Sequence, residues 1–89
     1  MTLSNKVYID LKKGDIHAFQ RVFDAYSGSI FNLAYSILKN KEQAEEIVQE
    51  TFLKVWLNHA SIDATKDIWF YIYVIAKRLC FNEIRAIKY

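Results

Sequence analysis

The first group of side chains whose types and spacing could carry chemistry lies in the middle of the chain. Four residues recur at steps of three and four, which places them on the same side of a helix: Glu46, Gln49, Glu50 and Leu53. Carboxylates and an amide beside leucines could dock onto arginines of a partner helix, through charge-assisted hydrogen bonds around an apolar contact. A solvated face that tolerates exposed leucines is the alternative, and spacing alone leaves both open.

The second group combines aromatic and basic side chains near the end of the sequence. Four aromatic residues are followed by four basic ones: Trp69, Phe70, Tyr71, Tyr73, Lys77, Arg78, Arg85 and Lys88. Proteins bind single-stranded DNA by stacking its bases on aromatic rings while cations follow the phosphates, and each stacked base contributes about 1–3 kcal/mol. The alternative is that most of these rings belong to the core and that the cations only solubilise a helix end.

The sequence contains no recognisable catalytic or metal-binding set. Di-metal sites in helical bundles use a glutamate three residues before a histidine, and neither His17 nor His59 has one. Cys80, the single cysteine, stands between Leu79 and Phe81, which is typical of a small core hydrophobe. The chain also lacks a glycine-rich phosphate loop. We therefore expect no enzyme activity, no metal and no cofactor.

Helices must position both groups, because the 89-residue chain has no proline and only two glycines. Its composition, 53% hydrophobic and 25% charged, is that of one globular domain. Apolar spacing predicts a short helix followed by three long ones, over residues 3–13, 16–38, 41–58 and 68–87. Residues 59–66 are predicted to form a loop. The expected fold is all-α, a compact bundle of three long helices plus a short N-terminal helix.

Residues typical of helix ends separate these segments. Gly14 suits the left-handed position after the first helix. Asp15, Asn40 and Asp67 can each cap the helix that follows. Gly28, flanked by two serines, predicts a kink or a break in the second helix, because glycine inside a helix costs about 1 kcal/mol relative to alanine.

The predicted long helices differ in their apolar faces. The third has one inner stripe with its flanks: Ala44, Ile47, Val48, Thr51, Phe52 and Val55. The fourth has two, one with Ile68, Ile72, Ile75, Leu79 and Ala86 and the other with Phe70, Tyr73, Val74, Phe81 and Ile84. Such a helix is either wholly buried or contacts something besides its own core. Residues 68–75 also have strong β propensity, but no second strand-like segment offers them a partner.

Charge and hydropathy limit the partners and the compartment. The net charge is +2, yet residues 41–56 carry −2 and residues 67–89 carry +2. This separation indicates either ordinary solvated faces or two partners, one basic and one anionic. The longest apolar run, residues 68–76, is well short of the roughly 20 residues that a membrane-spanning helix needs. A single cysteine excludes an intrachain disulfide, and we expect a soluble, cytoplasmic protein without membrane contact.

In their order, these residues resemble region 2 of the extracytoplasmic-function (ECF) sigma factors, the small sigma subunits of bacterial RNA polymerase. The resemblance rests on residues 14–19 (GDIHAF), Tyr26, residues 44–56 (AEEIVQETFLKVW), residues 71–76 (YIYVIA) and Arg85. Residues 44–56 are its most specific part, and it covers most of the chain. It implies a sigma region 2 fold and a role in transcription initiation without catalysis.

The resemblance also implies two binding surfaces. The helix at residues 41–58 would dock on the coiled-coil clamp helices of the polymerase β′ subunit, through Glu45, Glu46, Gln49, Glu50, Leu53 and Leu57. The segment after it would hold the −10 promoter element open as single-stranded DNA, with one base flipped into a pocket. The candidates for that contact are Ser61, Lys66, Trp69, Tyr73, Lys77, Arg78 and Arg85. An anti-sigma factor is a further possible partner.

The chain departs from the family pattern in three respects. Tyr71 and Ile72 stand where the family often has Trp-Leu, and Arg78 stands where it often has an asparagine that helps to recognise the flipped base. The family's second domain, which recognises the −35 element, does not fit within 89 residues. Residues 1–89 are therefore one domain, either a fragment of a longer protein or a single-domain relative, and we expect the fragment. The alternative function is a helical module that binds only proteins, such as an anti-sigma-type partner, without binding DNA.

Overall fold

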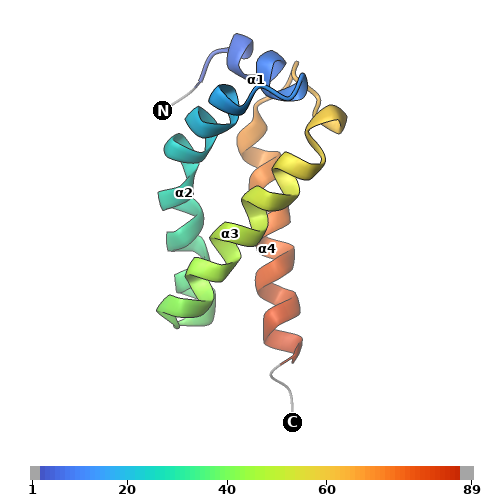
Figure 1. Cartoon of the computed structure of the whole chain (residues 1–89). Helices are drawn as coiled ribbons and strands as arrows, with labels where there is room; N and C mark the ends of the chain where they lie inside the picture. The colour runs from blue at the N-terminus through green and yellow to red at the C-terminus, as the bar shows by residue number, and fades with distance from the viewer. Residues whose placement is uncertain (1–2, 87–89) are drawn as a thin grey trace.

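The computed structural model describes residues 3–86 and consists of helices joined by short connections (Figure 1). The elements are α1 (Asn5–Lys12), α2 (Ile16–Leu38), α3 (Lys41–Leu57), the 3₁₀ helix η1 (His59–Ser61) and α4 (Ile68–Ala86). No strand occurs in the described part of the chain, which confirms the all-α fold and rules out the strand alternative for the segment that forms α4. Lys88 and the predicted helix end at residue 87 lie outside these residues.

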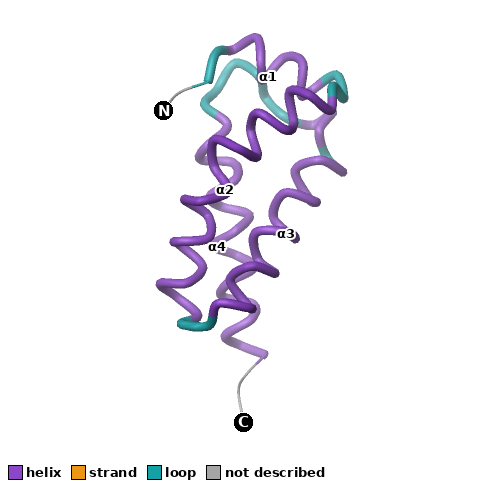
Figure 2. Tube along the Cα trace, turned by 60° about the vertical axis from the view of Figure 1, so that its left-hand side comes forward, coloured by secondary structure: helices purple, strands orange, loops and turns teal. Residues whose placement is uncertain are grey.

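The three long helices run along one another, and α1 lies across one end of the bundle (Figures 1 and 2). α2 packs against α3, and both contact α4, whereas α1 packs on α2 and touches η1. The molecule is elongated, with principal extents of 45, 22 and 19 Å. The segment between α3 and α4 therefore lies at the same end as α1, and the α2–α3 connection lies at the opposite end. None of the helices in residues 3–86 is long and apolar enough to cross a membrane.

The core forms where one stripe of each helix faces the others. On α2 the buried line takes every fourth residue: Ala18, Val22, Tyr26, Ile30 and Ala34. On α3 the predicted inner stripe is confirmed, because all six of its residues are buried. α1 adds Val7, Tyr8 and Leu11. Burial of these stripes is what holds the helices together, since most of the stability of a helix in a protein comes from tertiary packing of its apolar face.

The buried face of α4 differs from the predicted one. Its buried line runs through Ile68, Ile72, Ala76 and Cys80, while Ile75 and Leu79 are half-buried and Ala86 is exposed. A step of four residues forms one ridge of a helix. The small side chains of Ala76 and Cys80 fit on that ridge where α4 approaches the bundle. Cys80 is a buried core residue as predicted, and burial raises the pKa of its thiol.

The predicted N-terminal caps are confirmed. Asp15 Oδ1 accepts a hydrogen bond from the His17 amide at 2.9 Å, and Asn40 Oδ1 accepts one from the Gln43 amide at 2.9 Å. Asp67 Oδ1 accepts one from the Trp69 amide at 3.0 Å. Each bond satisfies a helix N–H that has no partner within the helix.

The two ends of α2 and its internal glycine have the following conformations. Gly14, with φ +91°, adopts the predicted left-handed conformation between α1 and α2. Lys39 is the C-cap of α2, with φ 56° and its N–H bonded to the Tyr35 carbonyl at 2.8 Å. The break predicted at Gly28 is absent, because α2 continues without interruption through that residue.

Candidate protein and nucleic-acid interfaces

The outer face of α3 carries the residues predicted to contact a partner protein. All six are exposed: Glu45, Glu46, Gln49, Glu50, Leu53 and Leu57. They are exposed because the inner stripe of the same helix packs into the core. Within residues 3–86, none of these carboxylates takes part in an ion pair. Leu53 is 53% exposed and Leu57 69% exposed, so the face combines free carboxylates with apolar contact area.

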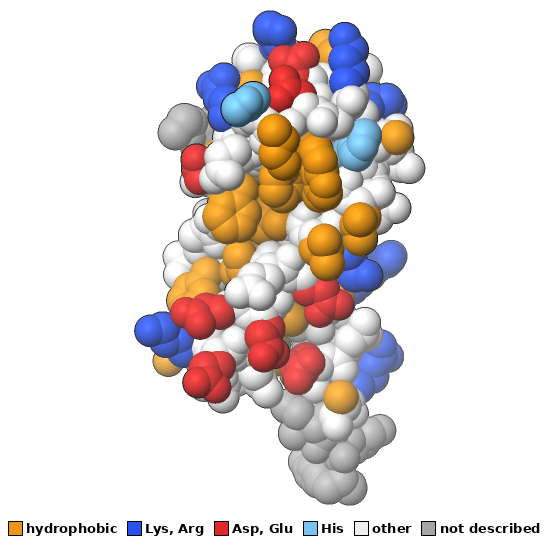
Figure 3. Space-filling model, in the orientation of Figure 1, with side chains coloured by type: hydrophobic (Ala, Val, Ile, Leu, Met, Phe, Trp, Pro, Cys, Tyr) orange, Lys and Arg blue, Asp and Glu red, His pale blue; other side chains and the backbone are white. Residues whose placement is uncertain are grey.

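An apolar surface adjoins these carboxylates on the α2–α3 side of the bundle. In Figure 3 the apolar side chains gather above a group of acidic ones on this face. The ring of Phe19 lies 5.2 Å from that of Trp56, and the ring of Phe23 lies 5.0 Å from that of Phe52. A shallow groove of 270 Å³ continues this surface between the two helices, lined by Phe23, Ser27, Phe31, Glu45, Val48 and Gln49.

The contribution of α2 to this surface is absent from the sequence-based prediction. Phe19, Phe23 and Phe31 are half-buried and each follows directly after a residue of the buried line of α2. That offset was visible in the sequence: phenylalanines recur one position beyond an apolar line of period four. It would have indicated an apolar flank facing α3.

A larger groove, of 660 Å³, lies between the segment 62–67 and the first turns of α4. Its walls carry six apolar or aromatic and four charged side chains: Ile62, Ile68, Phe70, Tyr71, Val74, Ile75, Asp63, Lys66, Asp67 and Arg78. Of the seven residues that the family resemblance predicts to contact DNA, Lys66 and Arg78 line it, together with Phe70 and Tyr71 of the aromatic group. Phe70, at 69% exposed, is the most accessible of its rings.

Three other predicted DNA-binding residues form a row beside this groove. Trp69 is half-buried, with its ring 5.4 Å from that of Tyr26 and 5.9 Å from that of Tyr73. The Lys77 ammonium lies 5.4 Å from the centre of the Tyr73 ring and 6.0 Å from that of Phe81. Trp69 is thus partly a core residue, whereas Tyr73 and Lys77 offer a ring and a cation next to each other.

The two remaining predicted residues lie on either side of these in the sequence. Ser61 is exposed at the end of η1, and Arg85 is exposed in the last turn of α4, where it donates to Asn82 Oδ1 at 2.6 Å. Lys54 of α3, which was not predicted to bind DNA, lines a 260 Å³ groove together with Arg78. Lys54 directly follows Leu53 in the sequence, and neighbouring residues of a helix face different sides. The sequence therefore already indicated that Lys54 lies off the leucine-bearing face of α3.

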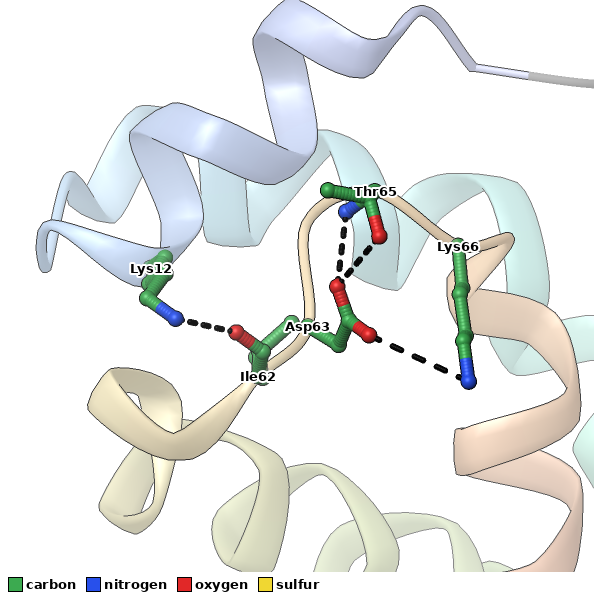
Figure 4. Close-up of polar contacts among 5 residues, drawn as sticks. All are labelled: Lys12, Ile62, Asp63, Thr65 and Lys66. Atoms are coloured by element: carbon green, nitrogen blue, oxygen red, sulfur yellow. Dashed lines mark hydrogen bonds and ion pairs between the residues drawn. The ribbon is translucent and has the colours of Figure 1, made fainter.

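The segment 62–67 is shaped by a turn at Asp63 (Figure 4). Asp63 Oδ1 accepts hydrogen bonds from the Thr65 amide at 3.0 Å and the Thr65 hydroxyl at 2.6 Å, and Asp63 Oδ2 lies 4.0 Å from Lys66 Nζ. These hydrogen bonds from Thr65 lower the pKa of Asp63 below its usual value. Asp63 therefore stays ionised and fixes a negative charge on the wall of the larger groove.

Among residues 3–86, no group of three or more histidine, cysteine, aspartate or glutamate side chains lies close enough together to hold a metal ion.

Two comparisons with known proteins bear on these surfaces. A family model described as sigma-70 region 2 matches residues 22–88. The chain is 37% identical over 78 residues to the ECF RNA polymerase sigma factor SigW of Bacillus subtilis (strain 168). That alignment covers 88% of this chain and 42% of the relative, so the chain spans less than half of the relative's length. Both matches agree with the resemblance found in the sequence.

Proposed function

We propose that this chain, which belongs to the sigma-70 region 2 family, directs RNA polymerase to promoters in transcription initiation. α3 docks on the coiled-coil helices of the polymerase β′ subunit, and α4 with the segment 62–67 binds the melted −10 element. The domain performs no catalytic step and uses no cofactor. The observation that carries the proposal is that the acidic, leucine-bearing face and the basic, aromatic face occupy different helices of one bundle.

Charge and exposure support α3 as the polymerase contact. Glu46 and Glu50 are exposed one helical turn apart, with Gln49 beside them. Carboxylates form bidentate hydrogen bonds with arginines, and such bonds are stronger than neutral ones. Leu53 and Leu57 add apolar area that becomes buried only when a partner covers it. Together they suit a partner helix with arginines around an apolar strip.

Rings and cations around the larger groove support α4 as the DNA contact. Phe70 and Tyr73 lie 6.5 Å apart and nearly parallel, and both can stack with unpaired bases. Lys66, Lys77 and Arg78 provide positive charge along the same region for the phosphates.

The groove itself favours a base over the sugar–phosphate backbone. Its volume of 660 Å³ lies within the range of ligand pockets. The carboxylates of Asp63 and Asp67 on its wall repel phosphates but can accept hydrogen bonds from the amino groups of bases. A flipped base of the non-template strand therefore fits the chemistry of this groove, with its phosphates held by the cations at the rim.

The test of this proposal is binding to a recombinant coiled-coil fragment of the β′ subunit. The wild-type chain is compared with a Gln49→Ala, Glu50→Lys double variant and with Asp24→Lys, a control on the exposed outer side of α2. We expect binding by the wild type and the control and loss of binding by the double variant, with unchanged circular dichroism in all three. A well-folded wild type that does not bind would reject the proposal.

The α4 surface favours one alternative function, a module that binds proteins only. Phe70, Phe81 and Ile84 are exposed by 69%, 46% and 42%, which is apolar area that a protein such as an anti-sigma factor could cover. The two functions differ in salt dependence. Binding to single-stranded DNA weakens linearly on a logarithmic scale as salt rises, and a protein-only module would show no such DNA binding even in complex with polymerase. The main proposal also includes a cytoplasmic location, where polymerase and chromosome lie.

A further inference from the structure

We propose that Lys12 and Tyr8, both on α1, are positioning residues that hold the segment 62–67 in the shape in which it meets DNA. The inference rests on the proposed function, because that function makes this segment a wall of the DNA-binding groove. Neither residue lines the groove itself. α1 also lies before the residues that the sigma-70 region 2 model matches, 22–88, so the family match does not include it.

Lys12 holds the start of the segment. Its ammonium donates a partly buried hydrogen bond of 2.8 Å to the carbonyl of Ile62, the residue directly before the Asp63 turn (Figure 4). The Ile62 side chain is buried at 2% exposed, so both the side chain and the carbonyl of this residue are held. The turn at Asp63 makes its own hydrogen bonds within the segment, and Lys12 connects that turn to the bundle.

Tyr8 holds the end of the segment. Its hydroxyl donates to Asp67 Oδ1 at 3.2 Å, and the same oxygen accepts the Trp69 amide at the start of α4. Tyr8 is 2% exposed, and the Tyr26 hydroxyl lies 3.5 Å from its own. Burial, the largest cause, raises the pKa of Tyr8 above its usual value, so its hydroxyl remains a donor even at alkaline pH where an exposed tyrosine would ionise. The carboxylate of Asp67, which caps the N-terminus of α4, is therefore hydrogen-bonded to Tyr8 of α1.

The turn after α1 adds a third contact to the same region. His59 Nδ1 lies 2.8 Å from the Lys12 carbonyl, and a Cβ placed at Gly14 would come within 3.1 Å of the His59 ring. η1 thus packs closely on the α1–α2 turn. The segment is therefore tied at both ends and at its preceding turn to one short helix, and that helix sets the shape of the groove wall.

The experiment measures binding of single-stranded −10 DNA by the full chain in complex with core RNA polymerase, over a range of salt concentrations. It compares the wild type with Lys12→Met, Lys12→Arg and Tyr8→Phe. The matched control is Lys13→Met, which removes the same charge from the neighbouring exposed position. Within residues 3–86, the Lys13 side chain has no hydrogen bond or ion pair.

We expect Lys12→Met to lower DNA affinity about tenfold, equivalent to about 1.4 kcal/mol, without changing the slope of affinity against salt. The slope stays constant because no phosphate contact is lost. Lys12→Arg restores the affinity, Tyr8→Phe lowers it, and Lys13→Met leaves it unchanged. A Lys12→Met variant with unchanged affinity, or one whose slope falls by about 0.7, would overturn the inference, the latter by making Lys12 a phosphate contact.

Hydrogen exchange separates this inference from the proposed function. In Lys12→Met we expect faster exchange of the Thr65 and Lys66 amides, which are bonded within the turn, and unchanged exchange of the α3 core amides. Equal exchange in the variant and the wild type would reject a positioning role whatever the DNA result. A wild-type complex that fails to bind DNA would reject the proposed function, while the exchange data still decide whether α1 holds the segment.

Discussion

At the scale of the single residue, Thr51 is a polar group placed in an apolar core. It is 0% exposed on the inner stripe of α3, and its hydroxyl is the one buried side-chain polar atom in residues 3–86 without a hydrogen-bond partner. A buried hydroxyl without a partner loses its bonds to water and gains none in return. Thr51 therefore lowers the stability of the fold without a compensating bond.

Replacing Thr51 tests this account. Thr51→Val keeps the branched shape and replaces the hydroxyl by a methyl group, so we expect the free energy of unfolding to rise by about 1 kcal/mol. Urea denaturation followed by circular dichroism measures it. Thr51→Ser, which keeps the hydroxyl and removes the methyl group, is expected to destabilise. A Val variant less stable than the wild type would show that the hydroxyl does have a partner.

Arg78 is the residue at which the two grooves of the α4 side meet. It lines both the 660 Å³ groove and the 260 Å³ groove that contains Lys54. We expect Arg78→Ala to weaken binding of single-stranded −10 DNA by the polymerase complex and to reduce its salt slope by about 0.7, as loss of one phosphate contact does. Arg21→Ala, on the exposed side of α2, is the control and should change neither quantity. Equal slopes in both variants would exclude a phosphate contact at Arg78.

At the scale of the element, α2 continues through Gly28 although glycine disfavours helix. The residue is exposed, and a Cβ added there would meet no atom within 4 Å. We therefore expect Gly28→Ala to raise the free energy of unfolding by about 1 kcal/mol, because alanine restricts the unfolded chain and adds no clash. Thermal denaturation measures the change. A destabilised variant would indicate that a bend at this position matters for packing.

The burial of Tyr8, which raises its pKa, predicts a dependence of stability on alkaline pH. The folded-state pKa of Tyr8 is raised, so its contribution is complete below about pH 10, the usual value, and decreases as pH rises further. There the unfolded chain releases the proton and the folded chain keeps it, which costs up to about 1.4 kcal/mol per pH unit. We expect urea denaturation between pH 9 and 11 to show a shallower loss in Tyr8→Phe. Equal slopes in both proteins would contradict the raised pKa.

What the sequence predicts at this scale depends on how local the cause is. The caps at Asp15 and Asn40 and the inner stripe of α3 follow from chemistry within four residues, and all are confirmed. The prediction of which α4 residues are buried was partly wrong, because it placed the more hydrophobic Ile75 in the core in place of the smaller Ala76. Small residues on a ridge are recognised only once the neighbouring helix is known.

The contacts around the larger groove could not be predicted from the sequence, for a different reason. Lys12 bonds to a carbonyl 50 residues away, and a carbonyl is present on every residue, so the sequence contains no signal for that pair. The sequence also contains no signal for which of the aromatic residues near the groove are packed in the core and which are accessible. Trp69 is half-buried because Tyr26 of another helix lies against it, and no local pattern separates it from the more accessible Phe70.

At the scale of the whole molecule, the two proposed binding surfaces lie on different helices of one packed core. Changes on exposed faces that share no partner usually act independently. We expect Glu50→Lys to weaken binding to the β′ fragment only, and Arg78→Ala to weaken DNA binding only. Their free-energy changes should add within about 0.5 kcal/mol in a double variant that assembles with polymerase and DNA. A larger coupling would mean that docking of α3 changes the α4 surface.

The close approach of Gly14 to His59 has a consequence for how this protein can vary. A side chain at position 14 would be strained by the φ of +91°, and the His59 imidazole, 3.1 Å from an added Cβ, would have to shift by a few tenths of an ångström. A side chain at this position therefore requires the turn to relax and the imidazole to move, and a smaller residue at position 59 would remove the second requirement. Relatives without glycine at this point should therefore differ, as a group, in the path of the chain between α3 and α4.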